Sequence, residues 1–410
     1  MTERLYYNDS FLHEFDGRVV SVTNDNGGTA ITLDRSAFYP ASGGQVFDTG
    51  WIEVSGSDGE KRRLHVTEVA ENEQTGEVIH YLEADAAMIS AGAIVHGMIE
   101  PSRRRDHMQQ HTGQHVLSAA FEKLYGFATV SFHMGDESCT IDLATEAVTA
   151  EQLRAAERLA NEIIAEDRPV EIKFASVDEA RAMGVRKIPP AERDKLRLID
   201  IREFDLNACG GTHVRSTGQI GSILLRKTEK VKQGVRVEFV CGLRAVATTR
   251  RDYETLTESA ALFSTHIYEV PQGIRKLQDE NKAAVKTQHK LLEELAEFQA
   301  QQMLRSAEQR GTHKLVVQCF ADRDLGFIKM LAQKLTKLGQ CAALLACGGA
   351  QPSLVFAQTP GLGNDMGALM KQAVQALGTR GGGNRDMAQG GAPDGQRAEE
   401  AIQEAAKQIT

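Results

Sequence analysis

The sequence lacks the features that mark membrane-spanning, secreted and organelle-targeted proteins. No run of roughly 18 apolar residues, the length of a transmembrane helix, occurs in the 410 residues. The chain begins MTERLYYNDS, which has neither the basic, apolar and small-residue order of a signal peptide nor an Arg-rich transit pattern. We therefore expect a cytoplasmic protein that makes no contact with a membrane.

The chain also has few cysteines, and they do not form the closely spaced pairs of a disulfide framework. Scattered cysteines in a chain of this length are typical of reduced thiols. At most one of them is expected to act as a metal ligand or a catalytic group. The six are Cys139, Cys209, Cys241, Cys319, Cys341 and Cys347.

The overall charge is unevenly distributed along the chain. A composition of 41% hydrophobic and 25% charged residues is that of a globular protein, and the length allows two to four domains. The net charge of -9 disfavours nucleic acid as a partner, but residues 1–100 hold 6 Lys and Arg against 17 Asp and Glu, whereas residues 181–250 hold 15 against 7. The second region is therefore basic enough to contact phosphates, although a solvated face of mixed charge is equally consistent with it.

Four segments follow one another along the chain. Residues 1–95 contain short β-rich runs (RVVSVT, TAITL, KRRLHVTEVA, EVIHYLEA) separated by turns such as NDNGGT and SGSDGE, which predict an antiparallel barrel or sandwich. Residues 96–245 mix helices with strands and predict an α+β core built on one sheet. Residues 246–310 are helical, and residues 311–410 alternate strands and helices as a separate α/β domain does. The overall class is α+β.

The helical segment and the glycine-rich tail each allow two interpretations. A 3,4 spacing of apolar residues, interrupted by Asn281 and Gln288, predicts either a coiled coil that joins two chains or a hairpin within one. The apolar positions are Ile274, Leu277, Ala284, Leu291, Leu295 and Phe298. The stretch Gly381 to Gly391 is either a linker or a loop within the last domain; we favour the loop, because only one short helix follows it.

Two pairs of side chains point to a metal site. His111 and His115 are four residues apart in a helical stretch, so both rings lie on one face. Cys209 and His213 are also four apart, but the two glycines between them favour a tight turn over a helix. Three imidazoles and one thiolate form a borderline-soft set that suits tetrahedral zinc better than magnesium or calcium. We expect one Zn²⁺ per chain.

The same spacing leaves the role of the metal open. A zinc peptidase would need a glutamate directly after the first histidine, and this position is Thr112. Four protein ligands are typical of a structural zinc site, whereas a catalytic site keeps one position for water or substrate. For a catalytic role, either one ligand is loose or displaced by water, or the coordination expands when the substrate arrives.

These residues resemble the alanyl-tRNA editing family, which comprises free-standing editing proteins and the editing domain of alanyl-tRNA synthetase. HTGQHVLSAAF and CGGTH are similar to its two zinc motifs, FYPASGGQVFDTG to its glycine-containing motif, and SFHMGDESCTIDL to the strand pair beside its pocket. GGGNRDMAQGG resembles the closing motif of the DHH-associated domain of the longest members. The resemblance implies zinc-dependent hydrolysis of tRNA(Ala) that carries serine, with glycine as a second substrate. Because no aminoacylation domain precedes the first segment, we expect a trans-editing protein that cannot charge tRNA.

Serine and alanine differ by one hydroxyl, so an editing site needs a polar partner for that group. Ser131 and Thr129 are candidates for this contact, although β-strand propensity also explains them. His133 is a candidate proton shuttle, because an imidazole has a pKa near ~6.5, but a hydrogen-bonded core histidine is the alternative. Gln114 is a candidate for orienting water, with ordinary helix polarity as its alternative.

The glycine-containing motif and several cations are candidate contacts for the substrate. Ser42, Gly43, Gly44 and Gln45 predict either a backbone nest for an anion or a plain hairpin turn, and we favour the nest. Positive side chains near the zinc motifs are candidate contacts for tRNA phosphates: Arg103, Arg104, Arg105, Lys187, Arg193, Lys195 and Arg197.

The expected protein is therefore an α+β editing hydrolase with an N-terminal β-barrel, a zinc-bearing core, a helical connector and a C-terminal DHH-associated-type domain. Its expected partner is mischarged tRNA(Ala), and a homodimer through the connector and the last domain is a further expectation. Two alternatives stay open. The chain could edit another mischarged tRNA such as Ser-tRNA(Thr), or it could be a non-catalytic, zinc-stabilised protein for RNA binding or dimerisation.

Overall fold

A computed structural model describes residues 1–25, 28–55, 60–83, 89–185, 195–232, 234–349 and 351–409. The chain divides into two compact units, Met1–Glu258 and Ser259–Thr410. The centres of the expected turns NDNGGT and SGSDGE lie outside the described residues. In the described part of the chain, no helix has the length and apolar character needed to cross a membrane.

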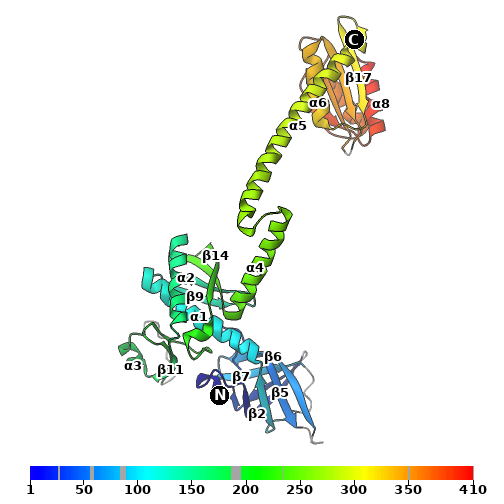
Figure 1. Cartoon of the computed structure of the whole chain (residues 1–410). Helices are drawn as coiled ribbons and strands as arrows, with labels where there is room; N and C mark the ends of the chain where they lie inside the picture. Colours follow the sequence, from blue (N-terminus) through cyan, green and yellow to red (C-terminus); the bar gives the residue numbers. More distant parts are fainter. Residues whose placement is uncertain are drawn as a thin grey trace. The chain divides into compact units, whose positions relative to one another are not determined.

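The first unit begins with a closed β-barrel (Figure 1) whose strands are ordered β2-β3-β7-β6-β5-β8. Their bounds are β2 (Glu14–Asp25), β3 (Gly28–Leu33), β5 (Gly50–Ser55), β6 (Lys61–Asn72), β7 (Glu77–Leu82) and β8 (Ile94–Ile99). Alternate side chains such as Ile52 and Val54 fill the interior, as the period of two predicts. The barrel interpretation is therefore confirmed over the sandwich. A short parallel pair, β1 (Glu3–Arg4) and β4 (Arg35–Ser36), flanks the 3-10 turn η1 (Leu5–Tyr7).

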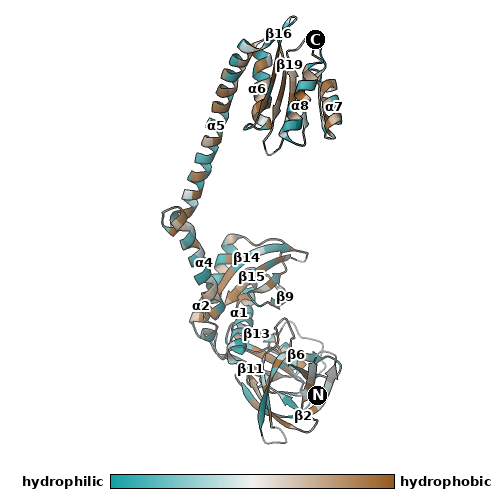
Figure 2. Cartoon of the chain, turned by 90° about the vertical axis from the view of Figure 1, so that its right-hand side faces the viewer, coloured by the Kyte–Doolittle hydropathy of each residue, from teal (hydrophilic) through white to brown (hydrophobic). Residues whose placement is uncertain are grey.

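Helix α1 (Pro101–Tyr125) lies between the barrel and a four-stranded sheet in both overall views (Figures 1 and 2). Pro101 occupies the first turn, where its missing N–H is not needed. Gly126 ends the helix in the left-handed conformation, with φ of 69°. Most of the central part of α1 is buried, which fixes the orientation of its side chains relative to both neighbours.

Two sheets, not the single sheet that we predicted, follow α1. The first is antiparallel with order β14-β15-β10-β9, and the second has order β11-β12-β13. Strand-like sequences predict strands but not their neighbours, and Leu196 and Leu198 of β12 pack into a separate small core beside α3. The bounds are β9 (Thr129–Met134), β10 (Cys139–Leu143), α2 (Ala150–Ala165), β11 (Val170–Ala175), α3 (Val177–Ala182), β12 (Leu196–Ile201), β13 (Asp205–Ala208), η2 (Thr217–Ile220), β14 (Ile223–Val231) and β15 (Gly234–Cys241).

The second unit contains a long helix and a six-stranded mixed sheet, ordered β16-β17-β18-β19-β21-β20, with helices on both faces. Figure 2 shows the hydrophobic central strands between α6 and the pair α7 and α8. The glycine-rich stretch forms a hairpin of this sheet, so the loop interpretation holds over the linker. The bounds are α4 (Gly242–Leu262), which spans the boundary of the units, η3 (Ile267–Glu269), α5 (Val270–Ser306), β16 (Glu308–Arg310), β17 (His313–Phe320), α6 (Leu325–Leu338), β18 (Cys341–Cys347), β19 (Ser353–Gln358), α7 (Met366–Leu377), β20 (Gly381–Gly383), β21 (Met387–Gly391) and α8 (Gly395–Ala406).

Candidate metal centre

The buried face of α1 carries the first pair of predicted ligands. His111 and His115 are 3% and 6% exposed, and their ring centroids are 5.4 Å apart. The i, i+4 spacing therefore brings both imidazoles to one place, as the sequence predicted. The ring of Phe132 packs against His111 with a centroid distance of 5.3 Å, which covers one side of the site.

The second pair comes from the irregular loop that follows β13. Gly211 lets this loop approach α1 closely, because a Cβ at this position would lie 2.1 Å from Cε1 of His111. Cys209 Sγ lies 3.4 Å from His111 Nε2 and 3.3 Å from His213 Nε2. The ligand atoms of His111, His115, Cys209 and His213 all lie within 4.8 Å of one another. The structure thus brings the four predicted ligands together.

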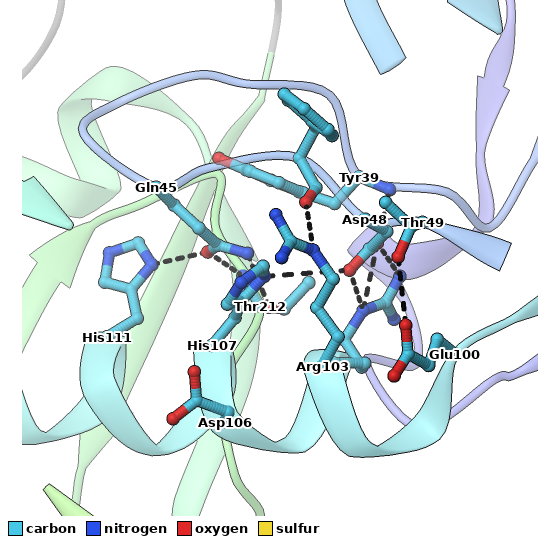
Figure 3. A network of polar contacts seen from close by, with 12 residues as sticks. Tyr39, Gln45, Asp48, Thr49, Glu100, Arg103, Asp106, His107, His111 and Thr212 are labelled. Carbon is cyan, nitrogen blue, oxygen red and sulfur yellow. Dashed lines mark hydrogen bonds and ion pairs between the residues drawn. The ribbon is translucent and has the colours of Figure 1, made fainter. Parts of the chain in front are cut away.

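Gln45 fixes the orientation of His111 and ties it to the loop (Figure 3). Its Oε1 accepts hydrogen bonds from His111 Nδ1 at 2.7 Å and from the Thr212 N–H at 3.1 Å, while its Nε2 donates to Thr212 Oγ1 at 2.9 Å. Because Oε1 can only accept, Nδ1 of His111 carries the proton and Nε2 presents a lone pair towards Cys209. Gln45 is 2% exposed, so it supports a ligand from behind; its predicted role in substrate binding has no support in this geometry.

The other two imidazoles are oriented in the same way. Asp205 Oδ2 accepts a hydrogen bond from His115 Nδ1 at 3.1 Å. Nδ1 of His213 lies 3.1 Å from Oγ1 of Thr112, which also accepts from the Val214 N–H at 3.2 Å. Each of the three rings therefore has a partner at Nδ1, which leaves each Nε2 free to bind a metal.

Electrostatic interactions within the cluster favour a thiolate. Burial raises the pKa of Cys209, but the neighbouring His111 and His213 outweigh this effect and bring it well below its ordinary value. Burial lowers the pKa of His213 to about 3. Burial also lowers the pKa of His115, but the hydrogen bonds with Asp205 and Cys209 raise it to about 10. The site thus favours an anionic sulfur, and a metal that binds His115 would displace the proton from its Nε2.

This donor set fits zinc. With Zn–S of about 2.3 Å and Zn–N of about 2.0–2.1 Å, a tetrahedral site has S–N edges of roughly 3.6 Å. The observed distances from Cys209 Sγ to the nitrogens of His111 and His213, 3.4 and 3.3 Å, are close to that edge. Oxygen-preferring cations such as Mg²⁺ and Ca²⁺ do not match a set without oxygen ligands.

The glycine-containing motif forms a tight turn that docks on β9. The N–H of Ser42 donates to Gln45 O and the N–H of Gln45 to Ser42 O, both at 3.0 Å, and Gly43 and Gly44 both have positive φ. This is the two-residue hairpin turn that was the alternative to an anion nest. The N–H of Met134 donates to Gly44 O at 2.9 Å, which attaches the turn to the edge strand of the sheet. The turn positions Gln45 against His111.

Two predicted site residues of β9, one for substrate binding and one for catalysis, point away from the metal cluster. Phe132 contacts His111 and Met134 is fully buried, so they face α1. Ser131 and His133 alternate with them and are exposed on the opposite face, where Ser131 Oγ donates to Asp142 at 2.7 Å. The geometry therefore argues against Ser131 as the contact for substrate serine and against His133 as a proton shuttle.

Gln114 and Thr129 meet at the same residue of α1. Both interact with Ser118 of α1: Gln114 Nε2 donates to its Oγ at 2.9 Å and Thr129 Oγ1 donates to it at 2.7 Å. Gln114 directly precedes His115 in the chain, and Gln114 and Thr129 are both partly buried. The three side chains form a short polar chain at Ser118, one helical turn after His115 in α1.

Arg104 is a buried structural residue and not a contact for tRNA. It is fully buried and paired with Asp48, which is also fully buried. Its remaining N–H groups donate to Ala37 O at 2.6 Å and Ser10 O at 2.7 Å. Because this network joins α1 to the barrel domain, the prediction that Arg104 binds a phosphate is wrong.

The other predicted cations have different positions. Arg105 and Lys195 are exposed, and Arg103 is partly buried with its Nε donating to Phe47 O at 3.0 Å. Arg197 is 7% exposed and donates to the Cys209 and Gly211 carbonyls at 2.7 and 2.9 Å, so it holds the ligand loop and is unavailable to a phosphate. The two predicted contacts that lie outside the described residues are Lys187 and Arg193.

A cavity of about 430 Å³ borders His213 within the first unit. It lies between the segment after η1, which includes Phe11, the strand β11 and the residues that follow His213. Arg215 stacks on Phe11 at its wall, with the guanidinium carbon 4.3 Å from the ring centroid. Of the four candidate ligands, His213 is the one that lines this cavity.

Comparison with known proteins identifies two matching family models. Residues 196–237 match the threonyl and alanyl tRNA synthetase second additional domain, which includes the Cys209 to His213 loop. Residues 2–103 match the class II (A) tRNA synthetases. A solved structure, the C-Ala domain of Aquifex aeolicus alanyl-tRNA synthetase, covers 25% of this chain and 97% of its own at 18% identity, but its TM-score of 0.24 does not establish a shared fold.

Two curated relatives align with almost all of the chain. The alanine–tRNA ligase of Thermococcus kodakarensis is 32% identical over an alignment of 417 positions, which covers 100% of this chain and 44% of the ligase. The chain thus spans less than half of the length of that relative. The alanyl-tRNA editing protein AlaX-L of Pyrococcus horikoshii is 30% identical over 399 residues, 95% of this chain and 94% of its own. On this full-length similarity, the chain belongs to the family of alanyl-tRNA editing proteins.

Proposed function

We propose that this protein hydrolyses the ester bond of mischarged tRNA(Ala), chiefly Ser-tRNA(Ala) and also Gly-tRNA(Ala), in a zinc-dependent reaction. The observation that carries the proposal is the convergence of four ligand atoms within 4.8 Å in a chain that aligns end to end with an editing protein. The similarity to an alanyl-tRNA editing protein supports an aminoacyl-tRNA as the substrate, and the cluster supports a metal-assisted hydrolysis.

The chain's own residues would hold the metal and the substrate. When bound, zinc supplies a Lewis acid that polarises the ester carbonyl or lowers the pKa of water. Cys209 contributes a thiolate, and the three imidazoles bind through Nε2 because Nδ1 is occupied. Gln114, beside His115, is the candidate for orienting water through its amide.

Selection for serine requires a polar group that alanine leaves unpaired. Thr129 is the remaining candidate, because its hydroxyl is near the ligand helix and donates to Ser118 at 2.7 Å. A serine hydroxyl that joined this chain would accept or donate one hydrogen bond more than alanine can. The loss of such a contact costs about 1–3 kcal/mol.

Two exposed cations and the cavity beside His213 fit a tRNA acceptor end. Arg105 at the start of α1 and Lys195 before β12 are available to backbone phosphates, which contribute affinity without sequence readout. The cavity of about 430 Å³ offers space for the acylated terminal nucleotide. Arg103 is a weaker contact, because its Nε is already bonded to Phe47 O.

The long helix α5 supports a homodimer. Its predicted seam includes Ile274, Leu277, Leu291 and Phe298, which are 43%, 55%, 58% and 58% exposed. A second copy of the helix would remove this apolar stripe from water, as in a coiled coil. Leu277→Glu is expected to give monomers in light scattering if the seam joins two chains.

A deacylation assay over a panel of tRNAs tests the proposed function. Wild-type protein is expected to hydrolyse Ser-tRNA(Ala) and Gly-tRNA(Ala) and to spare Ala-tRNA(Ala), while His111→Ala and Cys209→Ala lose the activity. Faster hydrolysis of Ser-tRNA(Thr) would favour the related editing reaction instead. If both variants stay folded, lose metal and still hydrolyse Ser-tRNA(Ala) at the wild-type rate, the protein is not a zinc-dependent hydrolase.

A further inference from the structure

A buried carboxylate stands behind one of the four candidate ligands. Asp205 Oδ2 accepts from His115 Nδ1 at 3.1 Å, and the two side chains are only 10% and 7% exposed. The corresponding partners of the other two rings are neutral: the amide of Gln45 and the hydroxyl of Thr112. The support of the three imidazoles is therefore asymmetric, with a negative charge behind His115 alone.

The carboxylate is itself held in place. Asn207 Nδ2 donates to both oxygens of Asp205 at 2.8 Å. The two residues alternate on β13, so their side chains lie on the same face, and this strand is held by its pairing with β12, where Asp205 is opposite Ile201 and Asn207 is opposite Ile199. Asp205 thus keeps its orientation without any contribution from a metal.

The charges in the cluster also balance. A divalent cation in a buried site is costly unless negative groups neutralise it. Cys209 supplies one negative charge when it binds the metal, because a cysteine ligand is a thiolate, and Asp205, which is hydrogen-bonded to His115, supplies the second. An imidazole that donates its N–H to a carboxylate is also a more basic and better oriented ligand.

We propose that Asp205 is a positioning residue that makes His115 the most firmly held ligand of the metal. The proposal rests on the zinc site of the proposed function and adds the group that determines its affinity. Asp205 acts through the His115 ring and has no contact with the substrate.

Three substitutions separate the charge, the contact and the orientation of the carboxylate. Asp205→Asn keeps an oxygen that can accept from Nδ1 but removes the charge, and Asp205→Ala removes both. Asn207→Ala leaves the carboxylate and frees its orientation. Asp200→Asn is the matched control, because Asp200 is an acidic residue of the neighbouring strand that pairs with Lys173 away from the cluster.

Zinc affinity, measured by competition with a chromogenic chelator, is the main readout. Asp205→Ala should bind zinc about 10- to 100-fold more weakly than wild type, which is the usual effect of losing such a partner. The zinc affinities of Asp205→Asn and Asn207→Ala should lie between those of wild type and Asp205→Ala. The affinity of Asp200→Asn should match wild type. The visible absorption bands of Co²⁺-loaded protein should shift in Asp205→Ala and not in Asp200→Asn, because only the former changes the donor strength of a ligand.

The outcomes are distinguishable from a failure of the proposed function. If wild-type protein binds no zinc, the metal site itself is refuted. If wild type binds zinc and all three variants of the Asp205 contact bind it equally well with unchanged cobalt bands, the positioning role is refuted. Should Asp205→Ala fail to fold, as judged by circular dichroism of the metal-free protein, Asp205→Asn and Asn207→Ala decide the question by the same criteria.

Discussion

Gly44→Ala should destabilise the first unit and disturb the metal centre. Gly43→Ala should destabilise the unit less and leave the metal centre intact. Both glycines have positive φ, 59° for Gly43 and 85° for Gly44, so an alanine at either position costs about 1–2 kcal/mol. A Cβ at Gly44 would lie 2.3 Å from the Phe132 carbonyl oxygen, while a Cβ at Gly43 meets nothing within 4 Å. Overpacking of this kind adds about 1–3 kcal/mol.

The effect on the site follows from the position of β9. Relief of the clash requires the turn or the strand to move, and Phe132 packs on His111 at 5.3 Å while Gln45, next to Gly44, bonds to the same ring. A displacement of about 1 Å near reacting groups can lower a rate by about 100-fold. We therefore expect a large loss of Ser-tRNA(Ala) deacylation in Gly44→Ala and a small one in Gly43→Ala.

Urea unfolding and deacylation kinetics measure both effects. The single tryptophan, Trp51, lies in the barrel strand β5, so its fluorescence reports on the first unit. The predicted losses are about 1–2 kcal/mol for Gly43→Ala and about 2–5 kcal/mol for Gly44→Ala. If Gly43→Ala instead abolishes deacylation at little cost in stability, the turn contacts the substrate directly and the docking argument is wrong.

Three further predictions concern buried polar groups of the first unit. Burial lowers the pKa of His80 to about 4, whereas an unfolded histidine titrates near 6.5. The unfolding free energy should therefore fall by about 3 kcal/mol as the pH drops from about 7 to about 4. In urea unfolding, His80→Gln should flatten this pH dependence. Arg104→Met should lower the unfolding free energy by about 3–5 kcal/mol, because it leaves the buried Asp48 carboxylate without its ion-pair partner. Arg105→Met, at an exposed site, should change it by less than about 0.5 kcal/mol. Equal effects of the two substitutions would contradict the structural role of Arg104. Gln45→Leu should weaken zinc binding about 10- to 100-fold in chelator competition, because His111 loses the acceptor at Nδ1, and unchanged affinity would remove Gln45 from the account.

The ligands could be predicted from the sequence because their spacing is local. His111 and His115 share a helix face at i, i+4, and two glycines between Cys209 and His213 indicate a turn that can approach it. What could not be predicted are the partners of the rings. Gln45 is 66 residues from His111 in the chain, and no periodicity connects the two.

Two of the wrong predictions, for Arg104 and His133, concern positions whose side-chain direction follows from the helix or strand period. Arg104 is seven residues before His111, so it shares the buried face of the same helix, and that position disfavours a surface contact. Alternation along β9 places His133 on the face opposite Phe132, but which face meets α1 depends on tertiary packing. The single sheet expected for residues 96–245 failed for a similar reason, since strand patterns do not specify pairing.

Zinc titration of metal-free protein, followed by Ser-tRNA(Ala) deacylation at each step, tests the central claim most directly. Hydrolysis should be absent without metal, rise in proportion to added Zn²⁺ and saturate at one ion per chain, with no rise in Cys209→Ala. Full hydrolysis by the metal-free protein, or the same titration curve in Cys209→Ala, would contradict a zinc-dependent editing site formed by these four side chains.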